Sequence, residues 1–185
     1  MHLWSGLGVV FLLLFRLMWG IFGGTASRFS TFVKGPTHIY GYLRRPAQYT
    51  DVGHNPLGAL SILVMIAVLS VQVASGLFSV GDDLAEGPLA ALLSYENTEL
   101  AFNIHKWMFN VLLVVIGLHI VAVLFYVLFL RKRLIRPMIS GRIQIGASTQ
   151  SLQAGSLWAA FVVAVVSLAI TVWIARGAYG LTMII

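Results

Sequence analysis

The sequence contains no cysteine among its 185 residues. Without cysteine the chain cannot form disulfides, thiolate metal sites, iron–sulfur clusters or the Cys-x-x-Cys-His attachment of a c-type haem. Any haem in this protein must therefore be held without covalent bonds.

Charged residues are also scarce. Only 10% of the residues are charged, six of them acidic, whereas 59% are hydrophobic and the mean hydropathy is +0.91. A soluble domain of this size could not bury so much apolar surface in one core, so we expect an integral membrane protein in contact with lipid. The net charge of +6 would suggest a nucleic-acid partner in a soluble protein. In a membrane protein it indicates residues that fix orientation, and no nucleic-acid partner is expected.

Motifs of hydrolytic or transferase chemistry are missing as well. The sequence has no metal-hydrolase motif, no phosphate-binding glycine loop and no nucleophile triad. What it does contain is four long apolar runs, at residues 3–22, 57–78, 101–130 and 157–175. Each has about 19 residues or more, close to the length that crosses a bilayer core of roughly 30 Å. These runs predict an all-α integral membrane helical bundle with four transmembrane helices, forming one domain over residues 1–185.

The connections between the runs differ in charge. The first and third are basic, whereas the second has no Lys or Arg and carries Asp82, Asp83, Glu86, Glu96 and Glu99. The positive-inside rule then places the basic connections in the cytoplasm, and the acidic one and both termini in the periplasm of a bacterial inner membrane. The first run would have to insert outward from two residues of leader, so we expect that an upstream helix is missing from this chain.

Two histidines lie in the third run, which is otherwise almost wholly apolar. His105 and His119 are 14 residues apart (119 − 105 = 14), so both lie on one helix face, about 21 Å apart along the axis. His2 begins the first run on the same side of the membrane as His105. Neutral imidazole is a good axial ligand for haem iron, and we favour ligation over simple interhelical hydrogen bonding. His2 and His105 could hold an outer haem, whereas His119 needs a partner on the cytoplasmic side.

Three more basic side chains are candidates of other kinds. His54 stands at the cytoplasmic start of the second run, and His38 lies in an expected loop at residues 32–43, where we expect a solvated side chain. Arg16 is 14 residues from His2 (16 − 2 = 14) and therefore on the same helix face. It could pair with haem propionates or extend its side chain to the cytoplasmic interface, and both interpretations stay open.

Several segments resemble one known family. They are HLWSGLGVVFLLLFRLMWG at 2–20, FVKGP at 32–36, GHNPLGAL at 53–60, HKWMFNVLLVVIGLH at 105–119 and LIRPMISGR at 134–142. In this order they resemble the bacterial di-haem membrane cytochrome b family, which comprises prokaryotic cytochrome b561 and the b-type cytochrome subunits of nickel–iron hydrogenases. The resemblance covers most of residues 2–142.

The resemblance implies a four-helix core with two b haems. Its periplasmic-side ligands fall on His2 and His105, and one cytoplasmic-side ligand falls on His119. The remaining ligand of the family lies on a helix upstream of His2, which this chain lacks. The second haem is therefore lost, or His54 replaces that ligand, or the natural protein is longer. His54 could otherwise line a quinone or propionate site.

We therefore expect a membrane b-type cytochrome with one or two non-covalent b haems. It would relay electrons between the quinone pool and a periplasmic partner such as cytochrome c or a hydrogenase-like subunit, as an electron-transfer subunit without catalytic residues of its own. The acidic connection would suit a cationic partner. Two alternatives stay open, a stand-alone superoxide or quinol oxidoreductase and a membrane anchor without haem whose histidines are structural.

Overall fold

A computed structural model describes residues 1–44, 56–81, 86–131 and 154–177. Its elements in chain order are α1 (His2–Phe22), α2 (Phe29–Phe32), α3 (Pro36–Arg44), α4 (Pro56–Phe78), the 3₁₀ turn η2 (Ala90–Leu92), α5 (Tyr95–Leu128) and α7 (Leu157–Ala175). His54, Arg133, Arg136 and Arg142 lie outside the described residues, and so do Asp82 and Asp83.

The starts of the long helices follow from local chemistry. Helix α4 begins at Pro56, whose fixed φ and missing N–H suit the first helical position. Helix α5 carries Glu96 in its first turn, where a negative charge favours the positive end of the helix dipole. The Ser156 hydroxyl accepts the Ala159 N–H at the start of α7. These signals place the helix starts just before the apolar runs.

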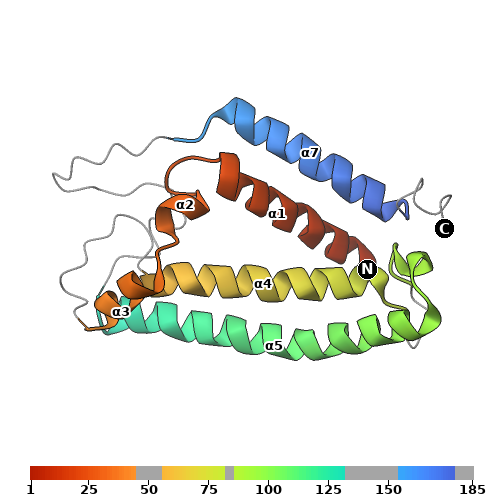
Figure 1. Cartoon of the computed structure of the whole chain (residues 1–185), viewed down its shortest axis with the longest axis horizontal. Coiled ribbons are helices and arrows are strands. Elements are labelled where there is room, and N and C mark those ends of the chain that lie inside the picture. The colour runs from red at the N-terminus through yellow and green to blue at the C-terminus, as the bar shows by residue number, and fades with distance from the viewer. Residues whose placement is uncertain (45–55, 82–85, 132–153, 178–185) are drawn as a thin grey trace.

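Four of these helices, α1, α4, α5 and α7, are long and apolar enough to cross a membrane. They lie in the order α7, α1, α4, α5 across the molecule (Figure 1), and α4 and α5 make the most extensive contact. The predicted all-α class with four membrane-length helices is confirmed. Their outward faces carry large exposed apolar side chains, which in a bilayer contact lipid.

Helices α1 and α7 pack through small and polar residues of α7. Val163, Ser167 and Thr171, spaced four residues apart along one face, are buried, and Ser167 is fully inaccessible. The Ser167 hydroxyl lies 3.7 Å from Met18 Sδ of α1. Small residues let helix backbones approach closely inside a membrane, where packing and not the hydrophobic effect holds helices together.

Two local expectations were wrong. Residues 32–43 are not a loop, because α3 occupies Pro36–Arg44 and contains His38. The buried Tyr42 of α3 hydrogen-bonds Tyr126 of α5 through the two hydroxyls, 3.1 Å apart. The third long helix also begins at Tyr95, before the apolar run that starts at Ala101. In both places polar residues belong to a helix, which a hydropathy profile alone does not predict.

Candidate functional site

His105 is held by residues of the neighbouring helix α4. Its Nδ1 lies 2.9 Å from the backbone oxygen of Gln72, and the Gln72 side-chain Nε2 lies 3.2 Å from each ring nitrogen. A carbonyl oxygen can only accept a hydrogen bond, so Nδ1 carries the hydrogen and Nε2 keeps its lone pair. Metal-bound histidines commonly donate their second nitrogen to a backbone carbonyl in this way.

Gly76 leaves the space that this ring occupies. A Cβ atom built on Gly76 would lie 2.7 Å from His105 Cε1 and 2.8 Å from Nδ1. Gly76 follows Gln72 by one turn of α4, so the ring rests where the helix has no side chain. The position of His105 therefore depends on the presence of glycine at position 76 as well as on hydrogen bonds.

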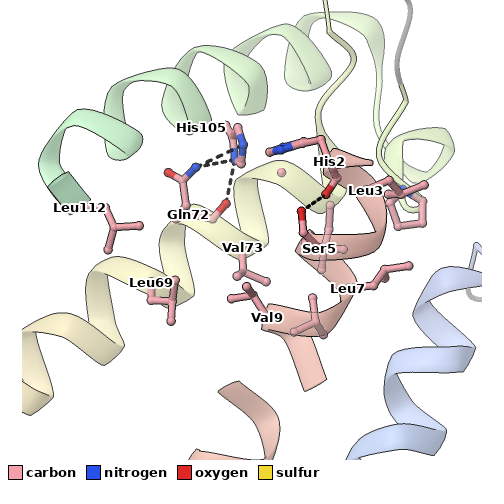
Figure 2. A pocket seen from close by; sticks show the side chains of 15 residues that line it. His2, Leu3, Ser5, Leu7, Val9, Leu69, Gln72, Val73, His105 and Leu112 are labelled. Carbon is pink, nitrogen blue, oxygen red and sulfur yellow. Dashed lines mark hydrogen bonds between the residues drawn. The ribbon is translucent and has the colours of Figure 1, made fainter. Parts of the chain in front are cut away.

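His2 of α1 faces His105 across the space between the helices. The ring centres are 5.9 Å apart and the ring planes meet at 77°. Figure 2 shows the His2 ring pointing toward His105 at the end of the cavity. Two imidazoles on opposite sides of one metal ion, each nitrogen about 2 Å from it, have ring centres roughly 6 Å apart. The separation therefore fits two axial ligands of a single iron.

The cavity between α1, α4 and α5 is mostly apolar. Its volume is about 210 Å³, and leucine and valine side chains line much of it below the two histidines (Figure 2). Pockets for organic ligands usually measure about 300 Å³ or more, so a macrocycle would require the lining side chains or α1 to move outward. An apolar wall with few polar groups is the usual lining for such a ligand.

A second histidine level lies further along α5. His119 Nδ1 is 2.9 Å from the hydroxyl of Ser61 on α4. Ser61 and Gln72 are 11 residues apart (72 − 61 = 11), which is close to three full turns, so they share one face of α4. The α4–α5 contact thus carries two polar pairs, Gln72 with His105 and Ser61 with His119. In the second pair the hydroxyl can also accept the Nδ1 hydrogen and leave Nε2 for a ligand.

Arg16 lies at the corner between α1 and α2. Its guanidinium group is 4.9 Å from the centre of the Phe29 ring and 5.9 Å from that of Phe32, and one N–H points to the Ser27 carbonyl at 3.4 Å. Cation–π contacts of this kind stabilise a partly buried arginine. In the described part of the chain these aromatic and carbonyl groups are the neighbours that the structure gives to Arg16.

Of the five predicted site residues, the structure brings His2 and His105 together and places His119 at a separate level of the same helix. His54 is outside the described residues, so its relation to His119 stays a prediction. Among the described residues no group of three or more His, Asp or Glu side chains could hold a metal ion. The arrangement suits two axial ligands of a haem, which itself supplies the other four nitrogens, better than it suits a metal ion bound by protein ligands alone.

Sequence analysis did not identify Gln72, Gly76 or Ser61 as site residues. The signal was present, since Gln72 is the sole carboxamide in the sequence of α4 and repeats the register of Ser61. Nothing in the spacing, however, indicates which histidine each residue meets. That pairing depends on the axial register between α4 and α5.

Comparison with known proteins gives one family match. The family model described as prokaryotic cytochrome b561 matches residues 1–141. No curated protein and no solved structure gives a significant match. The match covers most of the chain, including α1, α4 and α5 and the histidines of α1 and α5, and this family binds b-type haem in the membrane. The chain therefore belongs to the prokaryotic cytochrome b561 family, as a multi-pass membrane b-type cytochrome of electron transfer.

Proposed function

We propose that this cytochrome relays electrons between the quinone pool and a periplasmic redox partner, and that His2 and His105 are the axial ligands of its outer haem. The observation that carries the proposal is the facing pair of imidazoles, whose ring centres lie 5.9 Å apart. The partner would be a cytochrome c or a hydrogenase-like subunit. The isolated chain would then be an electron-transfer subunit and not an independent enzyme.

Bound haem supplies the one-electron chemistry, and the chain supplies its surroundings. His105 offers Nε2 because Gln72 holds the other nitrogen, and His2 offers a second imidazole from α1. The apolar side chains of the cavity exclude water, which keeps the environment of low polarity and raises the cost of extra charge. Axial ligands, burial and hydrogen bonding are thus the features by which this chain would set the reduction potential.

A second haem is proposed at the level of His119. The Ser61 hydroxyl beside Nδ1 would fix the His119 tautomer as the Gln72 carbonyl does for His105. The opposite ligand would be His54 or a residue outside this chain. Arg16 is the candidate for propionate pairing at this level. The cation–π contacts with Phe29 and Phe32 would keep its guanidinium group in place near the end of α1.

The proposed orientation places the His2–His105 end in the periplasm of a bacterial inner membrane. At that end the described acids Glu86, Glu96 and Glu99 are exposed, and they would attract a cationic partner. The basic connections, of which Arg28, Lys34, Arg44 and Arg131 are described, would lie on the cytoplasmic side.

The test is a pyridine haemochrome spectrum of the purified chain, with haem b counted per polypeptide. We expect His2→Ala and His105→Ala to remove the same haem, and His119→Ala to remove a different one where a second is present. His38→Ala serves as the control and should leave the count unchanged, because His38 lies in α3 and is not one of the proposed ligands. If no haem is bound, or if His2→Ala and His105→Ala both keep the full count, the proposal is wrong and a structural anchor becomes the better explanation.

A further inference from the structure

Gln72 is a buried carboxamide in a helix that is otherwise apolar or carries small hydroxyl groups. It is only 8% exposed, and its Oε1 has no hydrogen-bond partner among the described residues. An unpaired buried oxygen destabilises a fold, all the more where lipid excludes water. Packing of α4 alone therefore does not explain a polar residue at this position, whereas its contact with His105 does.

The backbone oxygen of Gln72 determines which nitrogen His105 presents. It accepts from Nδ1 at 2.9 Å, so the hydrogen stays on Nδ1 and the lone pair stays on Nε2. The same oxygen accepts from the Ser75 hydroxyl at 3.0 Å, which fixes this carbonyl group from a second direction. His105 is thus bound to a point that α4 itself holds rigidly.

The side chain of Gln72 restrains the plane of the ring. Its Nε2 lies at the same distance, 3.2 Å, from both ring nitrogens. Because the two distances are equal, the carboxamide nitrogen lies in the plane that passes through Cε1 and divides the ring symmetrically between its two nitrogens. This position is away from the direction in which the Nε2 lone pair points. The carboxamide therefore rests against the ring and leaves the lone-pair direction clear. Figure 2 shows Gln72 on the side of His105 that faces Leu112, whereas His2 lies on the other side.

We infer that Gln72 is a positioning residue for the axial ligand His105. Its carbonyl sets the tautomer, and its carboxamide sets the plane of the His105 imidazole, which stands here at 77° to the His2 ring. The inference rests on the proposed function, because it requires that His2 and His105 bind the same iron. The angle between two axial imidazole planes alters the splitting of the iron d orbitals, so the electron paramagnetic resonance spectrum of the ferric haem reports it directly.

The experiment uses the full haem-loaded chain in detergent and the variants Gln72→Met and Gln72→Asn. Methionine keeps the length without polar atoms, and asparagine keeps a carboxamide but withdraws it by one methylene. The wild type should give the low-spin signal with a large maximal g value that nearly perpendicular imidazoles produce. Both variants should shift this line to smaller g values or broaden it, and should lose haem to excess apomyoglobin about tenfold faster.

Ser70→Ala is the matched control in α4, because the Ser70 hydroxyl donates to Ile66 of its own helix and should leave both measurements unchanged. His105→Ala distinguishes a failure of the proposed function from a failure of the inference about Gln72. If it keeps the signal, the proposed function falls and this inference falls with it. If it removes the signal while both Gln72 variants match the wild type, the inference about Gln72 alone is wrong. Methionine is apolar and asparagine is polar, so if one variant fails to fold, the other still tests the inference.

Discussion

Single residues of α4 decide how the histidines of α5 are held. Gln72 and Gly76 fix His105 by two polar groups and one position without a side chain, whereas the Ser61 hydroxyl lies 2.9 Å from Nδ1 of His119. The Gln72 carbonyl and the Ser61 hydroxyl contact Nδ1, the ring nitrogen that the iron would not use. Their substitution should therefore weaken haem binding without removing a ligand.

Gly76→Ala should displace His105. The added Cβ would lie 2.7 Å from the ring carbon Cε1, a distance at which one of the two must move. We expect loss of most of the outer haem, measured as haem b per polypeptide. Gly117→Ala in α5 is the matched control, since a Cβ there meets nothing within 4 Å. An unchanged haem content in Gly76→Ala would contradict the placement of His105 against α4.

Ser61→Ala should weaken haem binding at the level of His119 while leaving the outer site intact. The substitution removes the hydroxyl 2.9 Å from Nδ1, and loss of such a supporting hydrogen bond typically costs about tenfold or more in metal affinity. Titration of the haem-free chain with haem, followed at the Soret band, measures the affinity of each site. Equal affinities for wild type and variant would show that Ser61 serves helix packing only.

The helices themselves differ in how firmly they are packed. Helices α4 and α5 make the most extensive contact, whereas α1 contacts α4 less extensively and packs against α7 on its other side (Figure 1). The cavity opens between α1 and the α4–α5 pair. When a macrocycle inserts, α1 is therefore the element that must adjust, and α7 must move with it.

Haem loading should consequently slow amide exchange in residues 2–10 of α1 more than in the facing turns of α5. In the haem-free chain α1 borders the cavity through Gly6, Leu7 and Val10, whereas α5 is already supported by α4. Hydrogen–deuterium exchange followed by mass spectrometry on both forms measures the difference. Equal slowing in both helices, or none, would place the haem elsewhere.

Ser167→Leu should destabilise the α1–α7 contact. Ser167 is fully buried against α1, with its hydroxyl near Met18, so a larger side chain has no space. Overpacking of this kind costs about 1–3 kcal/mol of stability. Thermal unfolding in detergent should show a lower midpoint, whereas Leu168→Ala on the exposed face should not. A wild-type midpoint for Ser167→Leu would mean that α7 is not tightly packed against α1.

At the scale of the whole molecule, charge is divided between its two ends. The described acids Glu86, Glu96 and Glu99 lie at the His2–His105 end, whereas Arg28, Lys34 and Arg44 follow α1 at the other end. Such a division orients a membrane protein and gives each end a different kind of partner. The haem proposed at His2 and His105 would be the one nearest to the acidic end.

Neutralising that end with Glu96→Gln and Glu99→Gln should slow electron exchange with a cationic cytochrome c severalfold at low ionic strength and flatten its dependence on salt. Both side chains are exposed on the first turns of α5, where they can attract a partner without supporting the fold. Stopped-flow oxidation of the reduced protein measures the rate. Arg28→Gln, at the opposite end, is the control, and an unchanged salt dependence in the glutamate variants would exclude this docking surface.

Simple counts and periods in the sequence define the class of molecule and its cofactor chemistry. Long apolar runs must become helices in a bilayer because every backbone polar group has to be paired within the segment. The 14-residue spacing of His105 and His119 fixes their common face through the helix period alone. The absence of cysteine limits a haem to non-covalent ligands. None of these inferences depends on which helix lies beside which.

The contacts that hold those histidines depend on the tertiary structure, although the sequence had already predicted that His2 and His105 pair. The approach of His2 to His105 joins helices α1 and α5, which are far apart in the sequence, and the pairing of Gln72 with His105 depends on the axial register of α4 against α5. Helix α3 likewise forms where hydropathy is low, since contacts such as that of Tyr42 with Tyr126 stabilise it from outside. Register and contact arise from the packing of complementary side chains across helices, which no local period encodes.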